Sequence, residues 1–266
     1  MLKKDQVLYW MPVLYDAYIG HKGFYVIGYT KSGTNWLKNM LRYYYDFKLP
    51  ARYIPGKPFF GPRVYHMHRF LPTSYFQKKS IYLVRDGRDT IVSRYFTMVN
   101  QASQSLMKKD FINYSGEMPT KENIKSLLPS YIKFLISYHK STIDYKSHVN
   151  KAINNDFFIL KYEDLHKETA QTLKKSVQYL TPGIEISDSR ISESVEYWSL
   201  EASKKRQKKD TGFFRKGGGQ TGDWKNYFTL ESANVYNDYA GDVLIKLGYE
   251  KSKDWVNNFI VSSNDS

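Results

Sequence analysis

Short runs of apolar and aromatic residues recur along the chain at the spacing expected for strands of a buried sheet. They cover residues 24–27, 63–70, 80–84 and 157–161. Their β-branched and aromatic composition is typical of buried strands, and the second run ends in a polar cluster. These runs predict the strands of the fold.

Between and after these runs, apolar residues recur at intervals of three and four, which predicts helices. The predicted helices begin at Thr34 and cover about 89–99, 124–138, 169–180 and 230–247. Asp86 or Asp89 is the expected cap of the second helix. The alternation of strands and helices predicts an α/β fold, in which one domain over residues 1–266 has a central, mostly parallel sheet flanked by helices.

Three segments do not follow this pattern. Residues 42–62 are aromatic and rich in proline and glycine, and predict a covering loop. Residues 100–122 are polar and are predicted to be irregular. The apolar run 7–15 is interrupted by Pro12 and closely followed by a strand, so it is predicted to be the first structural segment and not a signal peptide.

The first strand leads into a loop suited to a phosphate or a sulfate. Gly28 and Gly33 frame the loop, and the helix begins directly after it at Thr34. Backbone N–H groups and the positive end of a helix attract anions at such a turn, and Lys31 adds a cation. Thr34 stands where a nucleotide triphosphatase loop has its lysine, which disfavours that activity. An ordinary turn between strand and helix is the alternative at this point.

Composition limits the classes of function. The 266 residues include 40 lysines and arginines against 26 acidic residues, a net charge of +14. This excess favours a nucleic acid, an acidic membrane or a phosphorylated cofactor as ligand, although a lysine-rich surface would also explain it. The absence of cysteine excludes disulfides and thiol chemistry and fits a reducing compartment, so we expect a cytoplasmic location. No apolar run reaches the roughly 18 residues of a membrane-spanning helix.

Polar residues at the strand ends are the candidates for chemistry. His66 and His68 lie two residues apart, so in an extended chain they project to one face. No third ligand with suitable spacing accompanies them, and a metal site is not expected. Arg85 follows the strand over 80–84, and Ser93 comes eight residues later on the next helix. Arg85 is suited to a second anionic group, or alternatively to a salt bridge with the nearby aspartates.

Two basic segments occupy the C-terminal part. Residues 204–209 contain five lysines or arginines, which indicates a solvated loop, an anion-binding patch or a nuclear-import signal. Residues 213–228 combine a run of glycines with Arg215 and Lys216. The glycines let the backbone approach a ligand closely, and the two side chains supply charge.

Four blocks in order resemble the cytosolic-type sulfotransferase family. Residues 29–36 resemble its 5′-phosphosulfate loop, and residues 81–93 resemble its 3′-phosphate segment, with Arg and Ser at the same separation. Residues 161–165 are similar to the strand-to-helix turn that follows. Arg215-Lys-Gly with Gly222-Asp-Trp-Lys is similar to the C-terminal cofactor motif. The resemblance spans residues 24–230 and implies a P-loop-like fold.

The resemblance implies 3′-phosphoadenylyl sulfate (PAPS) as sulfuryl donor and PAP as product, with no metal. By matching positions, the 5′-phosphosulfate would be bound by Lys31, Ser32, Gly33, Thr34 and Asn35. Trp36 and Tyr162 would contact the adenine, and Ser199 and Leu200 would line the same pocket. The 3′-phosphate would be bound by Arg85, Ser93 and Arg215, with Lys216 and Gly217 alongside.

The resemblance also implies a catalytic mechanism. Sulfuryl transfer is an in-line displacement in which the protein mainly positions groups and neutralises charge. Lys31 is suited to stabilise the leaving phosphate oxygen, and a histidine is a suitable base for the acceptor. His68 matches the family's catalytic histidine, with His66 at a position that is basic in the family; the choice between them stays open, with His68 ranked first.

Two departures from the family pattern stand out. The stretch between Lys216 and Trp224 is about two residues longer than in the family, by the spacing of the motif. The segment that corresponds to the family's dimer motif ends in Asn234 where an acid is usual, so the oligomeric state stays open.

The acceptor is predicted only by class. A small molecule with a hydroxyl or an amine is expected, with residues 42–62 and 100–122 lining its pocket. A saccharide or a lipid head group is the alternative acceptor. A basic nucleic-acid-binding protein is a more distant alternative, and it is disfavoured because no nucleic-acid module is recognisable.

Overall fold

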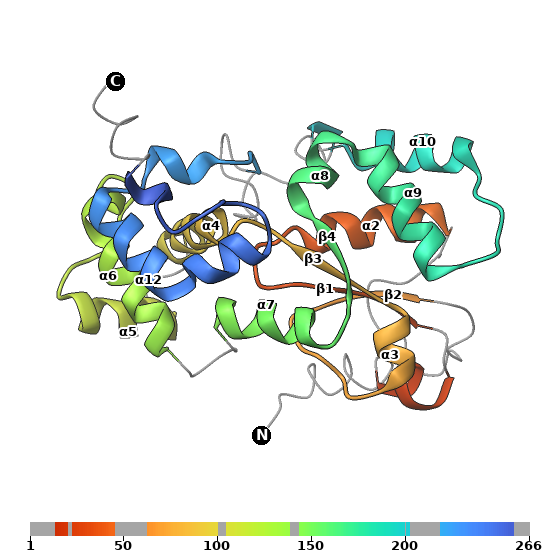
Figure 1. The fold of residues 1–266 in the computed structure, drawn as a ribbon, viewed down its shortest axis with the longest axis horizontal. Helices are drawn as coiled ribbons and strands as arrows, with labels where there is room; N and C mark the ends of the chain where they lie inside the picture. The colour runs from red at the N-terminus through yellow and green to blue at the C-terminus, as the bar shows by residue number, and fades with distance from the viewer. Residues whose placement is uncertain are drawn as a thin grey trace. The chain divides into compact units, whose positions relative to one another are not determined.

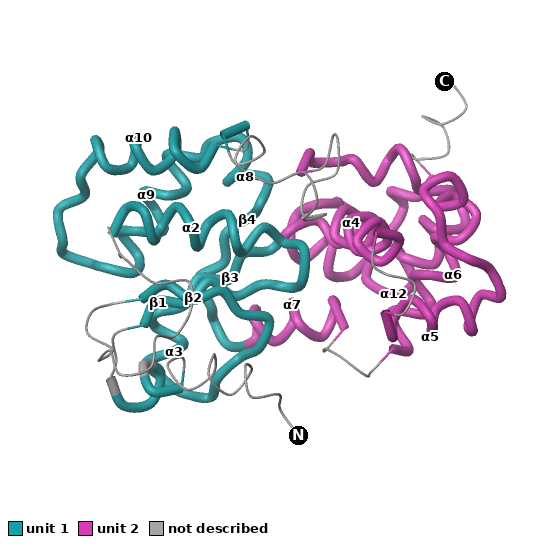
Figure 2. The backbone as a smooth tube through the Cα atoms, turned by 180° about the vertical axis from the view of Figure 1, so that it is seen from behind, with its two compact units in different colours: residues 1–84, 155–207 teal, residues 85–154, 208–266 magenta. Residues whose placement is uncertain are grey.

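The computed structural model describes residues 14–20, 23–45, 63–100, 105–138, 144–199, 201–202 and 219–257. The chain divides into two compact units (Figure 2). Unit 1 comprises residues 1–84 and 155–207, and unit 2 comprises residues 85–154 and 208–266. The assignment of residues 1–266 to one domain stays a prediction.

Unit 1 contains a sheet of four strands, β1 (Gly23–Ile27), β2 (Arg63–Met67), β3 (Ser80–Val84) and β4 (Phe158–Lys161). Their order in the sheet is β2-β1-β3-β4, and all three pairings are parallel (Figure 1). The strands lie where the apolar runs predict them, which confirms the predicted α/β fold with a parallel sheet. The predicted strand over 63–70 ends at Met67, just before His68.

One face of this sheet is covered by helices of unit 1: α2 (Thr34–Tyr44), α8 (Tyr162–Lys167), α9 (Thr169–Leu180) and α10 (Asp188–Tyr197). Alternate strand residues such as Phe24, Val26 and Val64 pack with Leu37 and Met40 of α2 in one buried cluster. This alternation follows from the period of two in a strand, and it sets which strand residues face α2.

The intervening strand residues face the other side. Tyr25 of β1 packs against Tyr65 and Phe76, with ring centroids 5.5 and 4.8 Å away. Phe76 belongs to the short helix α3 (Ser74–Lys78), whose N-cap Thr73 accepts a hydrogen bond from the Phe76 N–H. The π-helix η1 (Asp16–Gly20) packs beside β1 and α3. The sheet of unit 1 is therefore covered on both faces.

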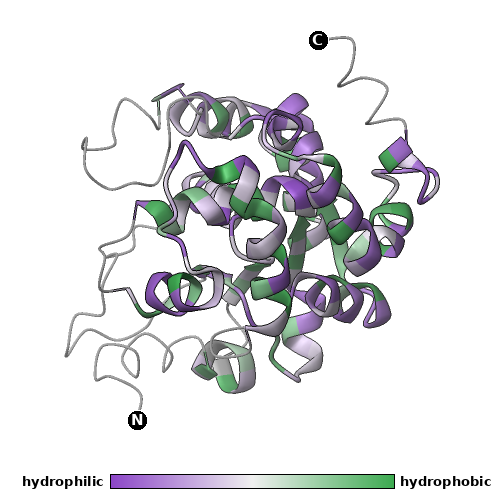
Figure 3. Ribbon diagram, turned by 90° about the vertical axis from the view of Figure 1, so that its left-hand side faces the viewer, coloured by the Kyte–Doolittle hydropathy of each residue, from purple (hydrophilic) through white to green (hydrophobic). Residues whose placement is uncertain are grey.

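Unit 2 is helical among its described residues. It contains α4 (Gly87–Val99), α5 (Leu106–Ser115), α6 (Ile124–Ser137), α7 (Tyr145–Asn154), the 3₁₀-helix η2 (Asp223–Asn226) and α12 (Leu230–Lys246). Aromatic rings from α4, α5 and α6 meet in its core, where Tyr131 lies edge-on to Tyr95 and Phe111, with centroids 5.2 Å away in both cases. The helices carry both hydrophobic and hydrophilic colours along their length, as expected of amphipathic helices (Figure 3).

The predicted helices are present with small shifts of their ends, and Asp86 caps α4 through its side chain. The prediction that residues 100–122 are irregular is wrong over α5, where Phe111 is fully buried. No helix is predicted over α3, α7 or α10. Among the described residues, no helix is both long and apolar enough to cross a membrane. Residues 46–62 and 203–210, with their predicted covering loop and basic run, lie outside the described residues.

Candidate anion-binding loop and active site

The loop between β1 and α2 has the backbone of an anion-binding turn. Lys31 and Gly33 both adopt positive φ angles, 72° and 87°. Gly33 is the N-cap of α2 and has no side chain to cap the first turn, while its carbonyl accepts from Trp36 N and Leu37 N. The leading N–H groups of the helix are therefore available to an anion, at the positive end of the helix dipole.

Both framing glycines are required by close contacts. A Cβ at Gly28 would lie 2.5 Å from the Leu83 carbonyl oxygen and 2.8 Å from Thr34 Cγ2. A Cβ at Gly33 would lie 2.6 Å from Cδ2 of the Tyr162 ring. The loop is thus held tightly between β3 and the start of α8, so its backbone N–H groups are fixed in place before any ligand binds.

Ser32 gives independent evidence for a ligand. The residue is 1% exposed, and its Oγ atom has no hydrogen-bond partner among the described residues. A buried hydroxyl without a partner costs about 1–3 kcal/mol, so such groups are normally paired. A phosphate or sulfate oxygen in the loop would pair this hydroxyl, and the 5′-phosphosulfate of PAPS therefore fits the residues present.

The two histidines lie at the end of β2, next to this loop. Their ring centroids are 5.9 Å apart, as expected of neighbours on one face. The Nδ1 atom of His68 lies 2.7 Å from the carbonyl oxygen of Gly28. Since a carbonyl can only accept, Nδ1 carries the proton in the neutral ring and Nε2 keeps its lone pair. His68 therefore has the tautomer that a base acting through Nε2 requires.

His66 has different electrostatics. Burial lowers the pKa of His66 to about 4, with smaller contributions in the same direction from Lys38 and His68. Its imidazole is neutral at neutral pH, so β2 presents no positive charge at this position. The two histidines that the sequence leaves as alternatives thus differ: the pKa of His66 is lowered by burial, and the Gly28 carbonyl fixes which ring nitrogen of His68 carries the lone pair.

An aromatic cluster lies beside the loop. Trp36 lies edge-on to Tyr162, with centroids 6.0 Å apart, and His166 lies 6.5 Å from Trp36. Trp36 Nε1 donates to the Trp198 carbonyl at 2.7 Å, next to Ser199, whose hydroxyl accepts from Ala202 N. Trp36, Tyr162 and Ser199, which the sequence assigns to one end of the ligand, are thus brought together within unit 1. His166 and Trp198 were missed, because only the fold places them here.

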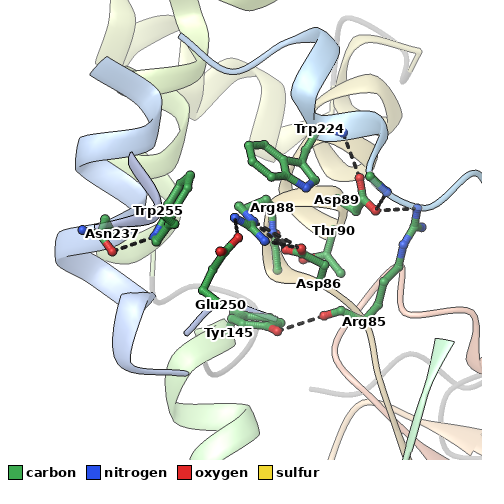
Figure 4. A network of polar contacts seen from close by, with 12 residues as sticks. Arg85, Asp86, Arg88, Asp89, Thr90, Tyr145, Trp224, Asn237, Glu250 and Trp255 are labelled. Carbon is green, nitrogen blue, oxygen red and sulfur yellow. Dashed lines mark hydrogen bonds and ion pairs between the residues drawn. The ribbon is translucent and has the colours of Figure 1, made fainter. Parts of the chain in front are cut away.

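Unit 2 holds the second candidate anion site. Arg85 Nη2 donates to the Gln220 carbonyl at 2.8 Å. The same atom lies 3.7 Å from Asp89 Oδ2 (Figure 4). The Asp89 carboxylate also accepts from the backbone N–H groups of Gly222 and Trp224, at 2.8 and 2.9 Å. Arg85 is therefore oriented by the segment that follows the glycine run. Both sequence alternatives for Arg85, anion binding and an ion pair with an aspartate, remain compatible with this geometry.

The buried carboxyl group of Asp89 has a shifted pKa. Burial raises the pKa of Asp89 to about 6, against the opposing effect of Arg85 and of the two N–H donors. Ser93, one helical turn further along α4, is half-buried. The long-range bonds of Asp89 had no signal in the sequence beyond its suitability as a helix cap.

The neighbouring Arg88 contacts residues of unit 2 that are far apart in the sequence. Its guanidinium forms a two-point contact with Asp86, at 3.0 and 2.7 Å, and bonds Glu250 at 2.5 Å. It also lies over the rings of Trp224 and Trp255, with its Cζ 4.0 and 4.6 Å from their centroids (Figure 4). A fully buried arginine with its charge compensated in this way is a structural anchor for the segment that starts with Arg85.

The remaining predicted site residues are Leu200, Arg215, Lys216 and Gly217, which lie outside the described residues. In the described part of the chain, no group of three or more His, Cys, Asp or Glu residues is arranged to hold a metal ion. The structure thus brings together residues 31–36, His66, His68 and Tyr162 in unit 1, and Arg85 and Ser93 belong to unit 2.

The chain is similar to several named sulfotransferases. It is 26% identical over 263 residues to mouse Sulfotransferase 2A6, covering 83% of each chain. It is 24% identical over 246 residues to a guinea pig 3-alpha-hydroxysteroid sulfotransferase, covering 79% of each. Among solved structures, mouse sulfotransferase SULT7A1 complexed with PAP matches with a TM-score of 0.58 and 19% identity, over 92% of this chain and 89% of that chain.

A second solved structure agrees on the fold. It is retinol dehydratase in complex with androsterone and inactive cofactor PAP, with a TM-score of 0.56 and 18% identity, over 88% of this chain and 85% of that chain. The family model of the sulfotransferase domain matches residues 57–255, which begin after the anion-binding loop. Since this match covers well over half of the chain, the protein belongs to the sulfotransferase family.

Proposed function

We propose that this sulfotransferase moves a sulfuryl group from PAPS to a hydroxyl or amine of a small-molecule acceptor, with His68 as the general base. The observation that carries the proposal is the 2.7 Å contact between His68 Nδ1 and the Gly28 carbonyl. It holds an imidazole with a fixed tautomer at the first residue of the anion-binding loop. A base in reach of the donor's reacting end is what the transfer requires.

Residues 31–36 are proposed to bind the 5′-phosphosulfate end of the donor. Gly33 and the start of α2 supply backbone N–H groups, and the buried Ser32 hydroxyl supplies a donor that the described residues leave unused. Trp36 and Tyr162 are proposed to contact the adenine, with Ser199 and Leu200 alongside. Aromatic rings are suited to this because a nucleobase stacks on them.

The 3′-phosphate is assigned to Arg85, Ser93 and Arg215, with Lys216 and Gly217. Of these, Arg85 is supported by its geometry, because Gln220 and Asp89 fix the direction of its guanidinium. An arginine held in one orientation can bind two phosphate oxygens at once. The net charge of +14 agrees with a donor that carries several negative charges.

When bound, the donor supplies the sulfuryl group, whose bond to the phosphate oxygen breaks as the acceptor oxygen or nitrogen bonds to sulfur. His68 Nε2 accepts the proton that the acceptor loses. Lys31, on the loop, stabilises the negative charge left on the phosphate oxygen. Both roles act on charge that develops in the transition state, so both side chains are expected to affect turnover more than binding.

The acceptor class follows from the relatives only as a proposal. One relative is named for a 3-alpha-hydroxysteroid, and one structural neighbour, retinol dehydratase, was solved with androsterone and also with retinol. These are apolar alcohols, so we infer that a hydrophobic alcohol is the first acceptor to test. A cytoplasmic location remains a prediction.

The test is transfer of labelled sulfur from PAPS to a panel of acceptors. The panel contains androsterone, retinol, a phenol, an aryl amine and an oligosaccharide. Labelled product with any of the first four, together with calorimetric binding of PAP, supports the proposal. If only the oligosaccharide gives labelled product, the acceptor is a saccharide and not a small molecule. Absence of PAP binding would overturn the assigned donor.

A further inference from the structure

We propose that Lys38 of α2 is a further catalytic residue, whose ammonium group contacts the 5′-phosphosulfate of the donor from the side of β2. The inference rests on the proposed function, because it assigns Lys38 to the same donor. It concerns a residue that neither the loop sequence nor its spacing pointed to. Three features of unit 1 support it: the position of Lys38 on α2, the face of β2 opposite it, and the charge of that region.

The first feature is the direction of the Lys38 side chain. Lys38 lies one helical turn after Thr34 and one before Leu41, and both of those residues are buried. Its Nζ atom donates to Asn35 Oδ1 at 3.1 Å. The ammonium group therefore reaches back toward the first turn of α2, as side chains on a helix tend to do. It lies beside Asn35, which belongs to the predicted phosphosulfate-binding residues.

The second feature is what faces α2 from the sheet. Val26 and Val64 belong to the cluster that packs with α2. His66 is the register partner of Val26 and lies two residues after Val64. Residues paired in a parallel ladder, and residues two apart on one strand, point to the same face. His66 therefore faces α2, on the side where Lys38 lies.

Electrostatics agrees with this placement. The charge of Lys38 contributes to the lowered pKa of His66, which requires the two groups to be close. Since His66 is neutral, Lys38 supplies a positive charge near His66 that His66 itself lacks. The helix thus supplies a cation that the strand position does not.

The third feature is the incomplete compensation of this charge. In the described part of the chain Lys38 forms no ion pair, and the amide oxygen of Asn35 is neutral. Burial lowers the pKa of Lys38 to about 8, with Arg42 adding to the effect. A partly buried ammonium without a counter-charge is costly unless a ligand supplies the charge. A phosphosulfate at the first turn of α2 would do so.

The role follows from the chemistry of the donor. Lys31 is part of the loop itself, whereas Lys38 lies on α2 and acts on His66 of β2. Two cations on different sides can neutralise charge on both the phosphate and the transferring sulfuryl group. Lys38 is therefore expected to bind the 5′ end in the ground state and to stabilise the transition state as well.

The test uses two nucleotides that differ at the 5′ end. Calorimetry measures the affinity of the wild type, Lys38→Met, Lys38→Arg and Arg42→Met for PAP and for adenosine 3′-phosphate, which has no 5′-phosphate. Lys38→Met is expected to weaken PAP binding about tenfold or more, by loss of a charge-assisted contact, and to leave adenosine 3′-phosphate binding unchanged. Lys38→Arg and the control Arg42→Met should keep PAP binding within about threefold, since both retain the cation.

A charge exchange separates this role from a structural one. The double variant Lys38→Met, His66→Lys moves the cation from α2 to the position on β2 that faces it. Recovery of PAP affinity and of turnover relative to Lys38→Met supports the inference, and thermal melting checks that each variant is folded.

Two results would overturn the inference while leaving the proposed function intact. In the first, Lys38→Met loses affinity for PAP and for adenosine 3′-phosphate by the same factor. In the second, Lys38→Met keeps the PAP affinity and the turnover of the wild type. If the wild type itself does not bind PAP, the proposed function fails, and the role of Lys38 fails with it.

Discussion

The Nδ1 atom of His68 lies 2.7 Å from the carbonyl oxygen of Gly28, and this contact joins the end of β2 to the first residue of the anion-binding loop. The two residues are 40 positions apart in the chain. The carbonyl fixes the neutral tautomer with a lone pair on Nε2. It also ties the ring orientation to the same loop that holds Ser32 and Lys31. The proposed base and the anion-binding loop are therefore positioned by one structural link.

The neutral state of His66 predicts an effect of pH on stability. Its pKa in the folded chain is about 4, below the ordinary 6.5, because of burial. Between these values the unfolded chain binds a proton that the folded chain excludes, so stability falls as the pH falls through this window. Between pH 8 and pH 5 the loss amounts to roughly 2 kcal/mol, because pH 5 lies about 1.5 units below the ordinary pKa. Urea unfolding of the wild type and of His66→Gln at pH 8 and pH 5 measures it.

The His66→Gln variant should lose clearly less stability than the wild type between these two pH values. The measurement at pH 8 serves as the reference, because His66 is neutral in both the folded and the unfolded chain there. Parallel curves for the two proteins would show that His66 does not cause the acid sensitivity.

Substitution of Gly33 is expected to lower the free energy of unfolding, because the loop is tightly packed around it. Gly33→Ala places a methyl group 2.6 Å from the Tyr162 ring and forces alanine to a φ of 87°. The strain and the overlap together should cost roughly 2–4 kcal/mol. Gly183→Ala is the matched control, because its φ is 80° and no atom lies within 4 Å of the added Cβ. It should cost only the strain, about 1–2 kcal/mol.

Unfolding by urea, followed for both variants, gives the comparison. Gly33→Ala should also lose PAP binding, since it displaces the start of α2. Equal destabilisation by the two substitutions would mean that the Tyr162 ring moves away freely and that the loop is not tightly held.

Substitution of Arg88 is expected to lower the free energy of unfolding, because it breaks a buried network of charges. Arg88→Met removes the counter-charge of the buried Asp86 carboxylate, which still accepts from the backbone N–H of residue 88, and should cost about 3–5 kcal/mol. Lys174→Met removes an ion pair of the same length, 2.7 Å, between two exposed side chains, and should change stability by less than about 0.5 kcal/mol. Thermal or urea unfolding measures both. A small effect of Arg88→Met would show that Asp86 finds water or another donor.

Much of the fold could be predicted because its signals are local. The strand runs around Val26 and Leu83 are continuous and apolar, and α6 has a clear period of three and four. α5 was missed because its buried residues are few and Lys108 is buried among them. α10 buries only Ile191 and Ser194, so its sequence looks like a polar loop until α2 covers it.

The candidate site divides in the same way. Lys31, Ser32 and Gly33 could be found because they are consecutive, and His68 because it follows a strand. The bonds of Asp89 to Gly222 and Trp224 join residues 133 and 135 positions apart, and no local pattern encodes such a pairing. The sequence does not distinguish Lys38 from an exposed helix lysine, because its burial depends on how β2 packs against α2.

The central claim is that His68 acts as the base of a sulfuryl transfer. The most direct measurement is turnover of labelled PAPS with the best acceptor by the wild type, His68→Gln and His66→Gln, together with the affinity of each for PAP. His68→Gln should lose turnover by about 10²- to 10⁴-fold and keep PAP affinity within about threefold, while His66→Gln loses far less turnover. Turnover by His68→Gln that equals the wild type, at equal PAP affinity, would contradict the account.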